Sequence, residues 1–335
     1  MAARILEAPR STTRRNIHIY HHSGHILGGT YQNGSLTGKN LYALCPLFLD
    51  FPQATLWSIF HVGDDGNTGP ILPRDGTTLG LGRYIVLKQD GTPLDVQTTT
   101  REAVRRVPSH PVSSSRMSSQ QRWFRDILRE RDGVCAVTGS GTAGDPEGLE
   151  ASHIFPIAAQ QEWMRNRYDH QWITDQIDAD KVGEYKMYSP QNGLLLEASL
   201  HHRFDRYSFA INPQDGYKVT VFKKDTFIGG IDGRALREEA WGTGRGSEQW
   251  RVSDGALLWH FEQAVLKNMK GAAGEQWPDW EFDFSMGGDM LGEIREGPEP
   301  GERMELELGN RLGVDDGMRS TWKYLFLIVS LVYFS

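Results

Sequence analysis

The sequence predicts an α+β fold, in which a β-rich N-terminal domain precedes a region that mixes helices with short strands. Three observations support this prediction. Short apolar and β-branched runs, separated by glycine-rich turns, fill most of residues 17–95. Amphipathic helical patterns begin near residues 119 and 254. Between them, residues 207–222 alternate around a turn sequence, which is typical of a hairpin.

The first elements are expected to be strands within residues 1–100. They are the runs "NIHIY", "LYALCPLFL", "TLWSIFHV" and "GRYIVLKQDGTPL". Residues 101–119 are rich in Ser, Pro and Arg, and we interpret them as a basic linker or exposed arm. A β-rich domain followed by a linker is therefore the predicted organisation of the first third of the chain.

A helix is predicted from Ser119, with Trp123, Phe124, Ile127 and Leu128 on one apolar stripe and a stop at Gly133. The runs "VCAVTG" and "LEASHIFPI" are expected to be short strands around a glycine-rich turn, and "YSFAINPQDGYKVTVF" a hairpin. These elements are grouped into one domain at residues 120–225.

The last predicted helix lies in residues 226–318, at "SDGALLWHFEQAVLKNMKG", where Leu258, Phe261, Val265 and Met269 recur near helical spacing. An acidic extension follows it. Residues 319–335 end in an apolar tail, which as a helix would reach about 18 Å against a hydrocarbon thickness of about 30 Å. No stable membrane insertion is expected, and a buried terminal strand or an artefact of the gene model are the interpretations that we keep.

The composition is that of a folded protein. The 335 residues are 39% hydrophobic, which is enough for two or more domains with their own cores. Cys45 and Cys135 are the only cysteines and form no CxxC pair, which argues against a disulfide framework and a structural cysteine–zinc site. A soluble, intracellular protein is expected, in the nucleus or the cytoplasm.

Charge is distributed unevenly along the chain. The formal net charge is −7, but residues 275–317 alone hold 13 acidic residues and 3 arginines. Residues 101–131 carry 8 arginines against 3 acidic residues. Because local charge decides where a phosphate backbone docks, nucleic acid remains a possible partner despite the acidic total.

One short motif carries chemistry of its own. If Ser199 caps a short helix, His201 and Asp205 lie four residues apart on one face of it. An imidazole and a carboxylate on one face can hold a divalent cation. An isolated HxxxD is more often a surface pair, so the neighbouring motifs have to decide between the two interpretations.

Those motifs are "EASHIFP", "SPQNGLLL" and "HHRFD", which place His153, Asn192 and His201 in the order His, Asn, His. Here the sequence resembles the HNH nucleases, a branch of the ββα-metal endonucleases. It is most similar to a fungal subgroup with "HI.P", "NGLLL" and "H..FD" signatures. The resemblance is strongest over residues 132–222, and it implies a ββα-metal core with a helical insertion and a C-terminal helix.

The resemblance also implies roles for residues. His153 matches the general base, and Asn192 the residue whose amide ties the loop and orients that base. His201 and Asp205 match ligands of one divalent metal ion, Mg²⁺ or Mn²⁺ ahead of Zn²⁺. His202 is either a phosphate contact or a plain surface residue. Arginines that would hold the nucleic acid backbone are Arg122, Arg125 and Arg129, with an arm around Arg105, Arg106 and Arg116.

The sequence departs from the family pattern at two places. Ser152 stands where many relatives have a third metal ligand, and its hydroxyl is a poor ligand for a hard cation unless water or Glu150 assists. The interval between His153 and Asn192 is long, and its aromatic residues Trp163, Tyr168 and Trp172 either contact substrate or pack the insertion onto the domain. Two functions follow: a metal-dependent endonuclease hydrolysing phosphodiester bonds, with DNA as first substrate, or a catalytically degenerate HNH module that binds nucleic acid or a protein.

Overall fold

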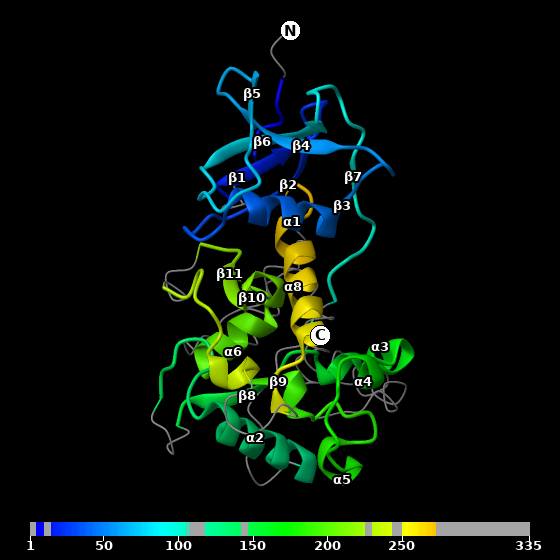
Figure 1. The fold of residues 1–335 in the computed structure, drawn as a ribbon, viewed down its shortest axis with the longest axis vertical. Coiled ribbons are helices and arrows are strands. Elements are labelled where there is room, and N and C mark those ends of the chain that lie inside the picture. The colour runs from blue at the N-terminus through cyan, green and yellow to red at the C-terminus, as the bar shows by residue number, and fades with distance from the viewer. Residues whose placement is uncertain are drawn as a thin grey trace, which may run out of the picture. The chain divides into compact units, whose positions relative to one another are not determined.

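The computed structural model describes residues 5–9, 15–104, 106, 118–141, 147–224, 230–242 and 250–272 (Figure 1). All of these residues belong to one unit of the chain, Met1–Glu275. This unit contains both helices and strands, and its sheets are small and open, so the α+β prediction is confirmed. The acidic stretch at 275–317 and the apolar tail at 319–335 lie outside the described residues. Within the described part, no helix has the length and apolar character needed to cross a membrane.

A five-stranded sheet forms most of the N-terminal region. Its strands, in spatial order, are β2 (Ile26–Thr30), β1 (Ile17–Tyr20), β6 (Gly82–Lys88), β4 (Trp57–Val62) and β5 (Thr68–Ile71). β1 and β6 run parallel, and the other neighbouring pairs are antiparallel. Three of the predicted strands are therefore confirmed.

The fourth, "LYALCPLFL", was wrongly predicted as a strand and is helical. α1 (Gly38–Phe48) begins after Thr37, whose hydroxyl accepts a hydrogen bond from the backbone of Asn40 while the Asn40 side chain binds the backbone of Thr37. This capping box fixes the helix start. The buried positions then follow helical spacing: Leu41, Leu44, Cys45 and Phe48. β3 (Leu49–Asp50) follows directly and pairs with β7 (Gln97–Thr98).

α2 (Ser119–Asp132) confirms the predicted helix and its glycine stop. Ser118 and Gln121 form its capping box, and Gly133, with φ of 68°, ends it in a conformation that favours glycine. Phe124 is buried together with Ile127 and Leu128, whereas Trp123 is half-buried. The apolar stripe therefore covers the strands beside it, because α2 contacts β8 and β9.

Two strands and a helix follow. β8 (Leu149–His153) pairs antiparallel with β9 (Gly193–Glu197), and α6 (Ala198–Asp205) starts directly after β9. β10 (Phe209–Asn212) and β11 (Lys218–Val221) form the predicted hairpin. The prediction of a strand at "VCAVTG" is wrong, because residues 136–138 form a turn that is closed by a hydrogen bond from Gly139 N to Cys135 O.

The interval between His153 and Asn192 is helical, as predicted. Its elements are η1 (Ile157–Ala159), α3 (Gln160–Asn166), α4 (Tyr168–Gln171), α5 (Ala179–Val182) and η2 (Pro190–Asn192). Trp163 is fully buried and contacts Phe155, and Phe155 in turn packs against Trp259. The sequence left two roles open for Trp163, contact with substrate or packing of the insertion. The structure shows that it packs the insertion.

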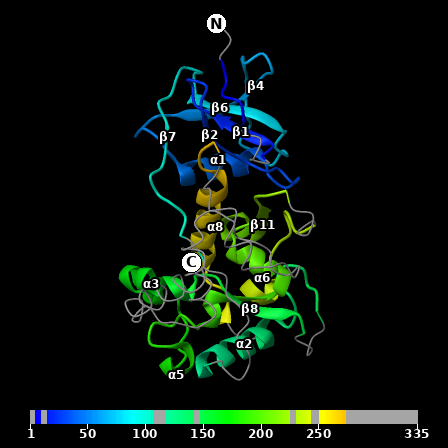
Figure 2. The same ribbon diagram turned by 180° about the vertical axis from the view of Figure 1, so that it is seen from behind.

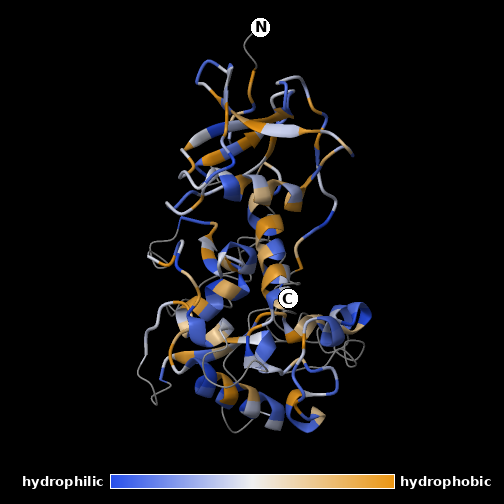
Figure 3. Cartoon of the chain, viewed as in Figure 1, coloured by the Kyte–Doolittle hydropathy of each residue, from blue (hydrophilic) through white to orange (hydrophobic). Residues whose placement is uncertain are grey.

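α8 (Asp254–Met269) joins the two parts of this unit, after the short helix α7 (Glu238–Trp241). It contacts α1 and β2 of the N-terminal region and β10 of the region that carries α6, and Figures 1 and 2 show it between them from both sides. Hydrophobic residues recur along it (Figure 3), and Leu257, Phe261 and Val265 are buried. Leu258 is half-buried. A helix that is buried on several faces serves as a shared core element.

Candidate functional site

His153 is the last residue of β8, where its register partner on β9 is Gly193. A Cβ on Gly193 would overlap Phe124 Cζ and lie 2.7 Å from Phe124 Cε2 and 2.8 Å from Leu128 Cδ1, so α2 approaches the strand too closely for any larger residue. The absence of a side chain at 193 lets the ring of Phe124 reach His153.

The imidazole of His153 lies among aromatic rings. It stacks on Phe124 with ring centroids 4.0 Å apart and an interplanar angle of 11°, and Tyr188 meets it edge-on at 5.4 Å. Its Nε2 is buried and has no hydrogen-bond partner among the described residues. Burial, with smaller contributions from the charges of Arg106 and His201, lowers the pKa of His153 to about 3. In the free protein the ring is therefore neutral at physiological pH.

Asn192 ties the chain on either side of the insertion together. Its Oδ1 accepts a hydrogen bond from Phe155 N at 2.8 Å. Its Nδ2 donates to Phe155 O at 3.2 Å and to Met187 O at 3.0 Å. The Asn192 side chain is fully buried, and both its amide oxygen and its amide nitrogen are hydrogen-bonded to backbone atoms. It therefore fixes the backbone at Phe155, two residues after His153.

His201 and Asp205 share one face of α6, as their spacing predicts. His201 Nε2 lies 3.4 Å from Asp205 Oδ2, and both residues are buried. The prediction of Ser199 as N-cap is wrong, because Glu197 is the N-cap residue and Ser199 lies inside the helix. β9 runs directly into the helix, so Ala198 already has helical geometry. The one-turn separation of His201 and Asp205 is unaffected.

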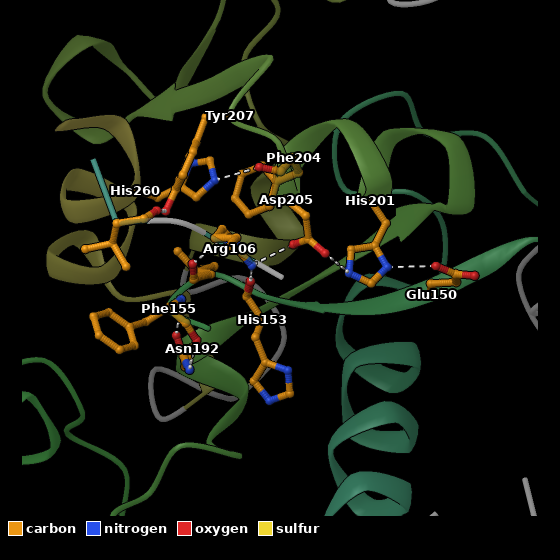
Figure 4. Close-up of polar contacts among 12 residues, drawn as sticks. Arg106, Glu150, His153, Phe155, Asn192, His201, Phe204, Asp205, Tyr207 and His260 are labelled. Carbon is orange, nitrogen blue, oxygen red and sulfur yellow. Dashed lines mark hydrogen bonds and ion pairs between the residues drawn. The ribbon is translucent and has the colours of Figure 1, made fainter. Parts of the chain in front are cut away.

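Glu150 contacts the other nitrogen of His201. Its Oε2 lies 2.7 Å from His201 Nδ1, from a strand that faces α6 (Figure 4). With the proton on Nδ1, the lone pair of Nε2 faces Asp205, which is the usual arrangement of a metal-ligating histidine. From the sequence, Glu150 was expected only to assist Ser152 in holding a cation. Its position two residues before Ser152, on the same face of the strand, is the signal that pointed to it.

Arg106 connects the strand and the helix of the site. Its Nη2 lies 2.6 Å from Asp205 Oδ1 and donates to His153 O at 2.7 Å, while Nη1 donates to Ile154 O at 2.9 Å. Only 5% of the residue is exposed. Arg106 is therefore not available to bind a phosphate backbone. The prediction that it belongs to an exposed arm that holds the nucleic acid is wrong. Arg105 and Arg116, the other arginines of that arm, lie outside the described residues.

The donor set can be tested against a divalent cation. His201 Nε2 and Asp205 Oδ2 face each other at 3.4 Å, so either a proton on Nε2 or a cation beside both atoms can join them. The buried Oγ of Ser152 has no partner among the described residues. No group of three or more His, Cys, Asp or Glu side chains suited to a metal occurs in the described ranges. Among the described residues, His201 Nε2 and Asp205 Oδ2 are therefore the two side-chain atoms that could hold a divalent cation here, and two protein ligands correspond to weak binding.

His153 does not point at this pair. In the close-up of Figure 4 its ring is directed away from His201 and Asp205, while its carbonyl oxygen turns toward Arg106. Strand alternation gives the reason, since Glu150 and Ser152 share one face of β8 and His153 lies on the other. A substrate that contacts both the His153 imidazole and the His201–Asp205 pair must therefore extend across the end of β8. Otherwise the side chain of His153 must rotate toward the pair.

The predicted backbone-binding arginines lie on α2, the helix that packs against His153. Arg122 is exposed, whereas Arg125 and Arg129 are half-buried. Arg125 Nη2 pairs with Asp126 Oδ1 at 2.8 Å, so part of its charge is already compensated. His202 is half-buried on α6, one residue after His201. Of these residues, Arg122 is the most accessible to a nucleic acid backbone.

A pocket of about 560 Å³ lies between the insertion and the start of α8. Its lining includes Trp172, Gln191 and Asp254. Trp172 stacks on Tyr168 with centroids 3.5 Å apart. None of the predicted catalytic, metal-binding or backbone-binding residues lines this pocket, although Gln191 directly precedes Asn192.

Residues 135–212 match the family described as HNH endonuclease. The matched stretch contains His153, Asn192, His201 and Asp205, and it excludes Arg106 and the whole of α2. No curated protein matches the chain, and no solved structure does.

Proposed function

From the match of residues 135–212 to the HNH endonuclease family, we propose that the protein is a metal-dependent endonuclease that hydrolyses phosphodiester bonds in nucleic acid. DNA is the substrate that we propose first, inside the cell. The observation that carries the proposal is the convergence of His201 Nε2 and Asp205 Oδ2, 3.4 Å apart, on the helix that follows β9.

In the proposed mechanism His201 and Asp205 hold one divalent cation, Mg²⁺ or Mn²⁺ ahead of Zn²⁺. When bound, this cation supplies positive charge to the phosphate while the attacking oxygen adds and the 3′ oxygen leaves. Glu150 keeps the proton of His201 on Nδ1 and so leaves Nε2 as the ligand atom.

His153 takes the proton from the attacking water in this mechanism. Its neutral ring has a lone pair for that task, but a pKa of about 3 makes it a weak base in the free protein. A phosphate diester bound beside the ring raises this pKa, because a nearby negative charge favours the imidazolium. Asn192 fixes the backbone that follows the base, and Arg122 with Arg125, Arg129 and His202 binds the nucleic acid backbone.

The test is nicking of supercoiled plasmid DNA with Mg²⁺ or Mn²⁺. The wild type is expected to nick, and His153→Ala to be slower by at least about 100-fold with an unchanged circular dichroism spectrum, because general base catalysis contributes 10²–10⁴-fold. His170→Ala, at an exposed position of α4, is the matched control and should nick like the wild type. If His153→Ala nicks as fast as its parent, His153 is not the base.

A degenerate HNH module that binds without cutting is the second candidate. Two observations favour it: the ring of His153 points away from the His201–Asp205 pair, and Arg106 already neutralises Asp205. For this alternative we expect DNA to bind, with an affinity that falls as salt rises, and plasmid to stay intact at any divalent cation concentration. Nicking that depends on His153 would exclude it.

A further inference from the structure

Arg106 reaches the site from outside the family-matched residues, and its contacts join three acceptors. Its guanidinium pairs with Asp205 Oδ1 on α6 and donates to the carbonyls of His153 and Ile154 at the end of β8. Because both of its Nη atoms are hydrogen-bonded to backbone carbonyls, the guanidinium has a fixed position, and its positive charge holds Asp205 Oδ1 beside Nη2. With Oδ1 held, the other oxygen of Asp205 faces His201.

The segment that carries Arg106 is itself held in place. Tyr207 Oη donates to Val104 O at 3.0 Å, and Val104 N donates to Gln263 Oε1 of α8 at 2.9 Å. The guanidinium carbon also lies 5.6 Å from the ring centre of Phe204. These contacts keep a buried positive charge at a fixed distance from the carboxylate.

We propose that Arg106 is a positioning residue of the site, which orients Asp205 toward His201 and lowers the affinity of the pair for the divalent cation. This inference rests on one part of the proposed function, namely that His201 and Asp205 bind a divalent cation. A cation on Oδ2 is repelled by the guanidinium on Oδ1, and burial weakens the screening of that repulsion. Arg106 therefore keeps the cation exchangeable while it holds its ligand in place.

The experiment measures Mn²⁺ binding to the full-length protein from the electron paramagnetic resonance signal of free Mn²⁺. Arg106→Gln removes the charge and keeps amide donors, so we expect its dissociation constant to fall about tenfold. In an Asp205→Asn background, adding Arg106→Gln should change the Mn²⁺ dissociation constant by less than about twofold. The reason is that Arg106 affects the cation through the carboxylate of Asp205, which this background lacks. Arg101→Gln is the matched control, since Arg101 bonds Leu47 O in the same segment.

Arg106→Lys keeps the charge without the fork. We expect Mn²⁺ affinity within about threefold of the wild type and a maximal nicking rate at least about fivefold lower, because an ammonium on a flexible stem lacks the planar arrangement of donors that holds the guanidinium between the two carbonyls and the carboxylate. A residue that only stabilised the fold would not separate cation affinity from maximal rate in this way.

Mn²⁺ binding that is unchanged or weaker in folded Arg106→Gln overturns the proposal, as does an absence of binding in both proteins. If Arg106→Gln does not fold, the guanidinium nitrogen signal of Arg106 in the wild type, assigned with Arg106→Lys, must shift as Mg²⁺ is added; a constant signal overturns the proposal. A wild type that binds Mn²⁺ with the expected response to Arg106→Gln but never nicks nucleic acid contradicts only the proposed function.

Discussion

His153 is a buried, neutral histidine between aromatic rings, and this state affects stability as well as chemistry. Its pKa is lowered to about 3 from an ordinary value of 6.5, mainly by burial. His260 is fully buried, with Nε2 bonded to Phe204 O at 3.0 Å, and burial lowers its pKa in the same direction. Below pH 6.5 the unfolded chain binds protons that the folded chain excludes, so both rings favour unfolding as the pH falls.

We therefore expect the free energy of unfolding to decrease as the pH falls from 6.5 to 3. The stability that the neutral His153 ring contributes is fully present above pH 6.5 and is lost over this range. At pH 4 this contribution amounts to a loss on the order of 3 kcal/mol. Urea unfolding of the wild type and of His153→Gln at pH 7.5, 6, 5 and 4 measures it, because the variant lacks the titrating ring. Parallel curves for the two proteins would contradict the lowered pKa.

At the same scale, the residues that the sequence predicted and those that it missed differ in how their partners are placed. His201 and Asp205 are one helical turn apart, so local spacing is enough to bring them together. Glu150 reaches His201 across 51 positions, and Arg106 reaches Asp205 from beyond the matched domain. Strand alternation indicates that Glu150 shares a face with Ser152, but which residue it contacts depends on how β8 packs against α6, and the partner of Arg106 depends on how the segment before α2 packs.

At the scale of elements, α1 shows why a short apolar run is ambiguous. "LYALCPLFL" has the length and composition of a buried strand, and only the capping residues Thr37 and Asn40 distinguish it as a helix. α2 and α8 were predictable because each is long, amphipathic in part of its length and has a serine cap, Ser118 and Ser253.

The contact between α2 and β9 depends on a glycine. We expect Gly193→Ala to cost about 1–3 kcal/mol of stability, because its methyl group overlaps Phe124 and Leu128, and to disturb the ring that stacks on His153. Thermal unfolding measures the cost. Gly76→Ala is the control, since Gly76 is exposed and nothing lies within 4 Å of its added Cβ, so its effect should stay within about 0.5 kcal/mol. Equal destabilisation by both changes would contradict the packing account.

At the scale of the whole described unit, the core of the HNH region is completed by α8. Ala256 and Leu257 of α8, with Val252 just before it, belong to the same buried cluster as the leucines of β9. Ser253 N also donates to Gln191 O at 2.8 Å, beside Asn192. The α6 helix, the candidate site and α8 are therefore parts of one packing arrangement, although about fifty residues separate α6 from α8 along the chain.

This arrangement predicts that residues 118–224, close to the domain that the sequence defines at 120–225, do not fold alone. Loss of α8 uncovers several apolar side chains, each worth about 1.5–3 kcal/mol, against a typical domain stability of about 5–15 kcal/mol. We expect no cooperative thermal transition for the fragment, measured by circular dichroism. Residues 1–272 are the control and should unfold cooperatively. A fragment whose midpoint lies within about 5 °C of that control would show that the HNH region is a domain independent of α8.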